Sequence, residues 1–322
     1  HYGLEHRHVA THIERVSREG DHFVLRSEHG ETIGRARHVL LALGHGEWRW
    51  PEVCAQQSAR LELTGLLYHS YQPKQYPADT VVVVGAGMAA MNEWVNVLRH
   101  GGRLIVVHRG RRLMEQALSA PRCSFSGPWL DRYHQMSPED RGEVLSALSR
   151  GTVPRSGRRI IRQARDEGRI QLISGEIAGI ERIGDRVSMN VRELGSGHLE
   201  TIEGAMMIAA TGFQSSWEDI PILRDLVEEQ GVTVCGTLLK LEDDCSVPVV
   251  SQLESSVALS GPLSRWAYPP ADSLAGMKYA GRRFAARVTG SNGPTVPAWW
   301  RMVRAGWARS GPQQDGESCA SR

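Results

Sequence analysis

A glycine-rich segment that follows four consecutive valines carries the clearest chemical signal in this sequence. Residues 81–84 are all valine, which favours a buried strand, and the next six residues read Gly85-Ala86-Gly87-Met88-Ala89-Ala90. Gly85 permits a tight turn, Gly87 lets bare backbone approach a ligand, and Ala90 allows a helix to pack closely on the strand. The free amides at the start of that helix would then bind the pyrophosphate of a dinucleotide.

The flanking sequence supports this interpretation. Residues 91–98 have the apolar spacing of an amphipathic helix, Gly101-Gly102 ends that segment, and residues 104–107 are typical of a second strand. Strand, glycine turn, helix and strand is the order of parts in a dinucleotide-binding unit. A glycine turn in an ordinary α/β unit is the alternative.

Arginines after the second predicted strand bear on which dinucleotide binds. In NAD sites a carboxylate about 20 residues after the glycine motif accepts the ribose hydroxyl. This chain instead has His108 and Arg109 there, followed by Arg111 and Arg112. A guanidinium group suits a 2′-phosphate, so the sequence favours NADPH, with Arg109 the first candidate because it is nearest the strand end. The alternative is a solvated basic turn in an arginine-rich protein.

Composition limits the class of protein. The 322 residues are 41% hydrophobic, enough for one large core or two smaller ones, and a formal net charge of +2 argues against nucleic-acid binding. No apolar run reaches the length of a membrane span and no signal-peptide pattern is present, so we expect a cytoplasmic protein without membrane contact. The histidine spacing indicates no metal site, and the absence of a C-x-x-C pair argues against a dithiol centre.

Two predicted β-meanders indicate a duplicated architecture. The first lies within residues 9–43 and leads into Ala42-Leu43-Gly44, and the second lies within residues 170–209 and leads into Ala210-Thr211-Gly212. Such duplication is typical of two dinucleotide domains, one nested within the other. The first domain should open with its own strand and glycine turn, and nothing before residue 81 provides one. We therefore expect an α/β fold with two nested Rossmann-like three-layer dinucleotide-binding domains and β-meander insertions, the first domain incomplete at its N-terminus.

Other elements are predicted from local signals. The stretch of about 40 residues after the arginine turn is rich in Pro, Ser and Arg and should be loop-rich, with one helix from Pro138 to Leu148 capped by Ser137. A further helix is expected near residues 160–167. Strands are expected at 170–174, 177–183, 186–191 and 199–209, and a helix with Asp272 as its N-cap near the end of the chain.

The order of these parts resembles the flavin-dependent oxidoreductases with two dinucleotide domains, above all the flavin-containing and N-hydroxylating monooxygenases. Residues 63–73, Leu-Thr-Gly-Leu-Leu-Tyr-His-Ser-Tyr-Gln-Pro, resemble the fingerprint F-x-G-x-x-x-H-x-x-x-(W/F/P), with Leu63 in place of Phe. Residues 208–213, Ile-Ala-Ala-Thr-Gly-Phe, resemble the A-T-G-(Y/F) motif at which the chain returns from the NADPH domain to the FAD domain. The resemblance spans roughly residues 1 to 290.

This resemblance implies a domain organisation. Residues 1–50 and 209–289 would form the FAD-binding domain, 51–79 a linker with the fingerprint, 80–208 the NADPH-binding domain, and 290–322 a C-terminal tail. His69 would have a positioning role rather than a catalytic one. The cofactor-binding residues implied in addition to the glycine and arginine motifs are Val9, Ala42, Gly44, His69, Ser70, Thr211, Gly212, Gly261 and Asp272.

The same resemblance implies the chemistry. Hydride would pass from NADPH to FAD, and the reduced flavin would support oxygenation of a small substrate at nitrogen, sulfur or a carbonyl group. No protein nucleophile is needed, so no catalytic residue is assigned, and the sequence identifies neither the substrate nor the oligomeric state. Two alternatives stay open: an FAD-dependent NAD(P)H reductase with a quinone or protein acceptor, and a truncated nicotinamide-binding module without catalytic activity.

Overall fold

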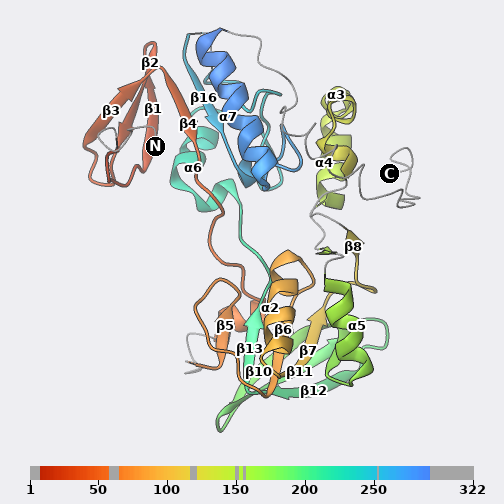
Figure 1. Ribbon diagram of the computed structural model, residues 1–322. Coiled ribbons are helices and arrows are strands. Elements are labelled where there is room, and N and C mark those ends of the chain that lie inside the picture. Colours follow the sequence, from red (N-terminus) through yellow and green to blue (C-terminus); the bar gives the residue numbers. More distant parts are fainter. Residues whose placement is uncertain are drawn as a thin grey trace. The chain divides into compact units, whose positions relative to one another are not determined.

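The computed structural model describes residues 8–57, 65–116, 122–148, 152–154, 157–251 and 254–290. The chain divides into two compact units (Figure 1). Unit 1 comprises residues 1–46, 123–145 and 215–322, and unit 2 comprises residues 47–122 and 146–214. The segment 123–145, which lies within the range expected for the NADPH domain, therefore packs in unit 1. No helix in the described ranges is both long and apolar enough to cross a lipid bilayer.

Unit 2 is built on a seven-stranded sheet with the strand order β12-β11-β10-β7-β6-β13-β5. Its parallel part consists of β10 (Ile170–Ile183), β7 (Arg103–His108), β6 (Thr80–Val84), β13 (Met206–Ala209) and β5 (Leu67–His69). The strands β11 (Arg186–Glu193) and β12 (Leu199–Gly204) continue the sheet beyond β10 as an antiparallel meander. Because parallel strands run in one direction, the turns that follow β7, β6, β13 and β5 lie along the same edge, where α/β proteins bind ligands.

The valine strand β6 is buried on both faces. Val81 and Val83 pack with the fully buried Trp94 of helix α2 (Met88–Arg99), whereas Val82 packs with Met189 of the meander. Helix α5 (Arg158–Asp166) belongs to the first of these cores and helix α1 (Glu52–Gln57) to the second. Successive side chains of a strand point to opposite faces, so this three-layer arrangement requires the unbroken β-branched run that the sequence shows.

Unit 1 contains the other predicted meander, formed by the antiparallel strands β1 (Arg15–Glu19), β2 (His22–Arg26) and β3 (Thr32–Ala36). Next to it in the chain, β4 (His38–Leu41) pairs in parallel with β16 (Ser256–Leu259). One core joins these strands to helices α3 (Gly127–Gln135), α4 (Pro138–Leu148), α6 (Pro221–Glu228) and α7 (Leu274–Thr289). The remaining short pairs are β8 (Glu115–Gln116) with β9 (Val153–Pro154) and β14 (Val234–Cys235) with β15 (Leu238–Leu239).

Most predicted elements are confirmed, and several details are wrong. Helix α4 has the predicted bounds, and the Ser137 hydroxyl accepts a hydrogen bond from the Asp140 amide at 3.1 Å, as a cap should. The range 199–209 is two strands rather than one, because the Ala205 amide donates to Thr80 O at 2.8 Å between them. Residues 170–174 and 177–183 are one strand with a bulge. Helices α3 and α6 were not predicted.

Two cofactor candidates lie outside their expected elements. Val9 precedes the first strand, which begins only at Arg15, and its side chain is 65% exposed. Asp272 is not the N-cap of helix α7: the neighbouring Ser273 is, because its hydroxyl accepts from the Gly276 amide at 3.2 Å. The first two fingerprint residues, 63 and 64, and the tail from residue 291 lie outside the described residues.

A buried ion pair attaches helix α2 to the segment that follows β5. Lys74 Nζ lies 3.5 Å from Glu93 Oε1, and the two side chains are only 3% and 6% exposed. The Tyr76 hydroxyl donates to Glu93 Oε2 at 2.8 Å and accepts from Asn96 Nδ2 at 3.2 Å. Burial raises the pKa of Glu93, and the Tyr76 hydroxyl and the Lys74 ammonium oppose that rise. A buried carboxylate needs such partners, since it has lost its water shell.

We expect Lys74→Met to lower the free energy of unfolding by about 3–5 kcal/mol, because it leaves the Glu93 carboxylate buried without its cation. The double variant Lys74→Met/Glu93→Gln should lose less than the single one, since no unpaired charge remains. Urea unfolding measures both. Arg186→Met is the matched control: it breaks the exposed Arg186–Asp79 pair, 33% and 45% exposed, and should cost at most about 1 kcal/mol. An equal decrease in the free energy of unfolding for Lys74→Met and Arg186→Met would contradict a stabilising role of the buried pair.

Candidate functional site

The turn after β6 has the geometry that the glycine pattern predicts. Gly85 has a φ of +132°, and its amide donates to Val107 O at 2.9 Å. A Cβ atom on Gly85 would lie 2.4 Å from the carbonyl oxygen of Ala210, which follows β13. Glycine is therefore required twice, for the left-handed backbone and for the close approach of the two turns.

Helix α2 begins directly after this turn. Gly87 is its N-cap, in extended backbone, and its carbonyl accepts from the Met91 amide at 3.0 Å. The amides of Met88, Ala89 and Ala90 precede that first intrahelical bond, and Gly87 offers them no capping side chain. Ala90 is fully buried in the core beneath. In the part of the chain that the structure describes, the start of the helix therefore presents amides without a backbone acceptor, together with the positive end of its dipole. This combination binds phosphate.

The turn after β7 carries three exposed arginines: Arg109, Arg111 and Arg112. Within the described ranges, none of the three forms an ion pair or a side-chain hydrogen bond. The Ser174 hydroxyl, opposite the end of β7 on β10, donates to Gly110 O at 2.7 Å and fixes the turn. The structure thus places uncommitted guanidinium groups one strand away from the glycine turn, where they could bind a phosphate.

His108 is the last residue of β7, directly before this turn. Its side chain is 7% exposed, and Nδ1 is buried without a hydrogen-bond partner in the described residues. Burial lowers the pKa of His108, and the Gly110 backbone partly offsets that effect. The imidazole is therefore neutral near pH 7.

His69 ends β5, on the other side of the glycine turn. It is fully buried, and its Nε2 lies 3.1 Å from the carbonyl oxygen of Gly212. Burial lowers the pKa of His69, so we assign the neutral tautomer that donates from Nε2 to this carbonyl. The contact holds the loop after β13 against the loop after β5. This geometry fits the positioning role expected for His69.

A short antiparallel pairing lies next to His69. Trp48 forms a β-bridge with Phe213, and the Arg49 amide donates to Gly212 O at 2.9 Å. The Thr211 hydroxyl donates to the Arg49 carbonyl, so it is engaged within the protein. The predicted residues Thr211 and Gly212 are thus brought together with His69, and both lie beside Ala210, which contacts the glycine turn.

Buried polar atoms without partners concentrate along this edge. Of the six such atoms in the described residues, three belong to residues that end a parallel strand or follow one: His69 Nδ1, Ser70 Oγ and His108 Nδ1. Buried polar atoms in proteins are ordinarily hydrogen-bonded. Their concentration here fits a site that a polar ligand completes, as the dinucleotide assignment requires.

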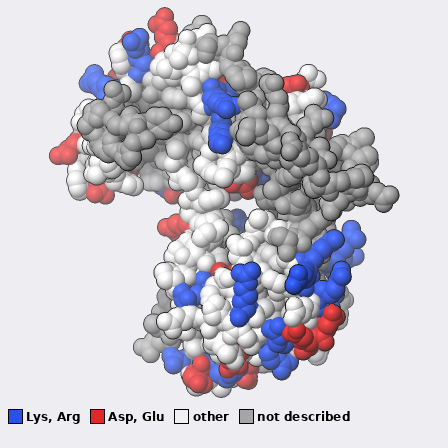
Figure 2. Space-filling view, viewed as in Figure 1, with Lys and Arg blue, Asp and Glu red and all other residues white. Residues whose placement is uncertain are grey.

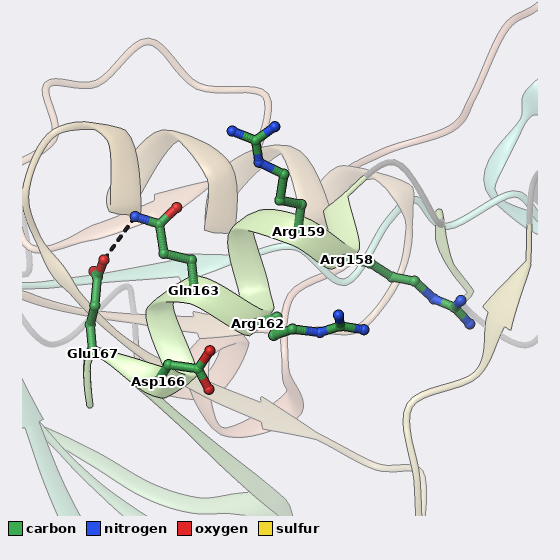
Figure 3. Close-up of a pocket in the computed structure, with 6 residues that line it drawn as sticks. All are labelled: Arg158, Arg159, Arg162, Gln163, Asp166 and Glu167. Carbon is green, nitrogen blue, oxygen red and sulfur yellow. Dashed lines mark hydrogen bonds between the residues drawn. The ribbon is translucent and has the colours of Figure 1, made fainter.

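Helix α5 adds positive charge next to helix α2. A Cβ atom on Gly157, the N-cap of α5, would lie 1.2 Å from Met91 Cε in the first turns of α2, so the two helix starts are in contact. The exposed face of α5 has a hollow of about 500 Å³ (Figure 3). Arg158 and Arg162 extend to one side of the helix there, and Asp166 lies further along it. Figure 2 shows basic side chains gathered on one side of this unit, with acidic ones close by.

The residues expected to contact FAD lie in unit 1. Ala42 and Gly44 follow β4, and Gly261 follows the parallel neighbour β16, so the two turns share one edge. The Ser260 amide donates to Leu41 O at 2.9 Å, and Gly44 and Gly261 have φ values of +71° and +82°. The structure brings these three predicted residues together. Val9 and Asp272 are exposed, and within the described ranges neither forms a hydrogen bond with these turns.

Sequence reasoning missed several residues of this edge. Ser174, which fixes the arginine turn, and Lys74, which anchors the loop after β5, belong to no motif. One weak indication in the sequence suggested that Lys74 has a specific role: lysine occurs at only three positions, 74, 240 and 278, in an arginine-rich chain. Trp48 and Tyr71, which lie against His69, had no signal of their own.

Three features together define the fold of flavoproteins with two dinucleotide domains. They are a glycine turn that opens a helix in a parallel sheet, an arginine turn after the next strand, and a second α/β unit. The family model of L-lysine 6-monooxygenase/L-ornithine 5-monooxygenase matches residues 1–215. The chain belongs to this family.

Solved structures agree with this fold. The cadaverine monooxygenase DfoA of Erwinia amylovora, bound to FAD, is 14% identical with a TM-score of 0.68, and the match covers 90% of this chain and 71% of that chain. The L-lysine 6-monooxygenase of Pseudomonas syringae is 19% identical with a TM-score of 0.64 and coverages of 86% and 70%. The ornithine N-hydroxylase KtzI of Kutzneria sp. 744, with reduced FAD, NADP+ and L-ornithine, is 15% identical with a TM-score of 0.62 and the same coverages. No curated protein sequence matched the chain.

Gly85→Ala should lower the free energy of unfolding by about 3 kcal/mol or more, because the clash with Ala210 adds to a backbone strain of about 1–3 kcal/mol. Gly184→Ala is the matched control: Gly184 also has a positive φ, +62°, but nothing lies within 4 Å of its added Cβ. The control should cost only about 1 kcal/mol. Thermal unfolding measures the stability of both variants. A similar loss of stability in Gly85→Ala and Gly184→Ala would show that the close approach to Ala210 does not constrain residue 85.

The buried neutral His108 predicts a loss of stability in mild acid. As the pH falls through 6.5, the ordinary pKa of histidine, His108 binds a proton in the unfolded chain but stays neutral in the folded protein. The unfolded state is thereby stabilised, so the free energy of unfolding falls. His108→Gln should lessen the decrease between pH 7 and pH 5.5, by at most about 1.4 kcal/mol per pH unit. The exposed His198→Gln variant should follow the wild type. Identical pH profiles for all three proteins would refute the effect.

Proposed function

We propose that this protein is an NADPH-dependent flavoprotein monooxygenase that hydroxylates the primary amine nitrogen of a small molecule such as a basic amino acid or a diamine. The observation that carries the proposal is the family match over residues 1–215. The geometry of the edge described above supports it, because amides and guanidinium groups suited to a phosphorylated dinucleotide lie next to one another. The finer assignments, namely the domain boundaries, the cofactor-contacting residues and a cytoplasmic location, are part of the proposal.

The proposed reaction consumes NADPH, a proton, dioxygen and the amine R–NH2, and it yields NADP+, water and the hydroxylamine R–NHOH. FAD, when bound, accepts the hydride and activates dioxygen. The reacting nitrogen must be uncharged, because its lone pair forms the new N–O bond. No protein nucleophile is required, which agrees with the absence of a nucleophile motif in the sequence.

The chain's own residues would bind and orient the cofactors. The amides of Met88, Ala89 and Ala90 would bind the pyrophosphate of NADPH, and the arginine turn would bind its 2′-phosphate. In unit 1, the turns at Gly44 and Gly261 would give FAD the close backbone approach that side chains would block.

The reaction is tested by following NADPH oxidation, oxygen uptake and hydroxylamine formation with L-lysine, L-ornithine and cadaverine in the presence of FAD. One of these amines should yield hydroxylamine in proportion to the NADPH and oxygen consumed. Rapid NADPH oxidation with a quinone under argon, with no hydroxylamine formed in air, would instead establish the reductase. A chain that binds NADPH but not FAD would be the non-catalytic module.

The arginine turn should determine the preference for NADPH over NADH. We expect Arg109→Gln to weaken NADPH binding about tenfold or more, because hydrogen bonds to charged groups contribute about 1.5–3 kcal/mol, and to leave NADH binding unchanged. Arg192→Gln, at an exposed arginine on β11, is the control and should change neither affinity. Isothermal titration calorimetry measures both nucleotides. An equal loss for NADPH and NADH would show that Arg109 does not contact the 2′-phosphate.

A further inference from the structure

We infer that Trp48 and Tyr71, whose rings pack on the buried His69, form the surface against which the nicotinamide ring of NADPH binds. This inference rests on the proposed function, and it assigns a ligand-contacting role to two aromatic residues, Trp48 and Tyr71, that no motif marks. It concerns unit 2 alone.

Five rings form an aromatic cluster around His69: Trp48, Trp50, His69, Tyr71 and Phe213. The Trp48 ring stacks on the imidazole with a centroid distance of 5.2 Å and an interplanar angle of 9°, and the Tyr71 ring stacks on it at 5.8 Å and 23°. Trp50 and Phe213 meet the imidazole edge-on, at 5.5 and 6.1 Å. Tyr71 also contacts Phe213 at 4.8 Å. The cluster therefore holds the orientation of its rings.

The exposure of these rings is uneven. His69 is fully buried at the centre, yet Tyr71 is 57% exposed and Trp48 is 37% exposed. Packing explains a buried histidine enclosed by aromatic rings, but it does not explain two large rings left open to solvent beside it. An exposed aromatic face fixed by neighbouring rings is suited to stacking a planar ligand.

The position of the cluster matches one end of the dinucleotide. Along the sheet edge, the arginine turn follows β7, the glycine turn follows β6, and the loop of His69 follows β5, two strands further on and about 10 Å from β6. If the 2′-phosphate lies at the arginines and the pyrophosphate at the start of α2, the other half of NADPH extends over the ends of β13 and β5. Contacts join the two places, since Gly85 abuts Ala210 and His69 bonds to Gly212 two residues later.

The loop that carries Tyr71 is held rigidly. The buried Lys74 ammonium donates to the carbonyl oxygens of Ser70 and Gln72 at 2.9 Å each and of His69 at 3.3 Å. The Gln72 side chain in turn accepts from the His69 amide at 2.6 Å. A fixed wall is what hydride transfer needs, because the nicotinamide ring must keep one face toward its acceptor.

The polarity of the aromatic cluster also matches that of a nicotinamide ring. Reduced nicotinamide is uncharged and carries a carboxamide group that both donates and accepts hydrogen bonds. The buried imidazole behind the two exposed rings is neutral, and the adjacent Ser70 hydroxyl is buried without a partner in the described residues. The exposed arginines lie at the opposite, phosphate end of the edge.

Binding of NADPH and of 2′,5′-ADP, which lacks the nicotinamide half, separates the two ends of the site. With the full chain and FAD present, we expect Tyr71→Ala to weaken NADPH binding about tenfold and to leave 2′,5′-ADP binding unchanged, as measured by calorimetry. Tyr71→Phe keeps the ring and should bind both ligands like the wild type, and Trp48→Leu should behave like Tyr71→Ala. Ile183→Ala, at an exposed apolar residue of the β10–β11 hairpin, is the control and should change neither.

The ratio of the NADPH and 2′,5′-ADP dissociation constants tests the inference even where a variant is partly unfolded, because unfolding lowers both apparent affinities by the same factor. An unchanged ratio in both Tyr71→Ala and Trp48→Leu would overturn the inference while leaving the proposed function intact. A wild-type chain that binds neither NADPH nor 2′,5′-ADP would instead refute the proposed function itself. A raised ratio of dissociation constants, rescued in Tyr71→Phe, would establish the nicotinamide surface.

Discussion

The close approach of two backbone turns at the edge of the parallel sheet is the constraint on which unit 2 depends. Gly85 lies so near the carbonyl of Ala210 that any side chain would collide with it. The turn that opens helix α2 therefore has no side chain at Gly85 or Gly87, and in the described residues the amides of Met88, Ala89 and Ala90 have no backbone acceptor. Every other feature of the site is arranged around this turn, with the arginine turn on one side and the loop of His69 on the other. A substitution here would disturb the packing of β6 on β13 as well as ligand binding.

Charge along this edge is distributed according to burial. The exposed arginines keep their hydration and need no partner, whereas Lys74 and Glu93 are buried and are paired with each other. The two buried histidines of this edge, His69 and His108, have no carboxylate partner among the described residues. Burial lowers the pKa of each, so they are neutral near pH 7. One end of the edge is therefore positively charged and the other is uncharged and aromatic. NADPH has the matching distribution, with its phosphates toward one end and a neutral ring at the other.

Local signals in the sequence were reliable where a few neighbouring residues determine the structure. The valine run, the glycine turn, both meanders and helix α4 with its Ser137 cap were all predicted and are confirmed. The errors occur where two local choices are nearly equivalent. Asp272 and Ser273 are both good capping residues, and the structure uses Ser273, whose hydroxyl also donates to Pro270 O. Residues 199–209 read as one strand, yet they join two different ladders, an antiparallel one with β11 and a parallel one with β6.

The sequence by itself determined the dinucleotide fold, the position of the glycine turn and the arginines that follow it, because each depends on residues close together in the chain. Only the tertiary structure decided that Lys74 pairs with Glu93, that helix α5 begins against α2, that residues 123–145 pack in unit 1, and that Trp48 and Tyr71 enclose His69. Most of these contacts join residues far apart in the sequence. Their partners are selected by the burial of apolar surface and the pairing of buried charge across the whole fold, which a local pattern does not record.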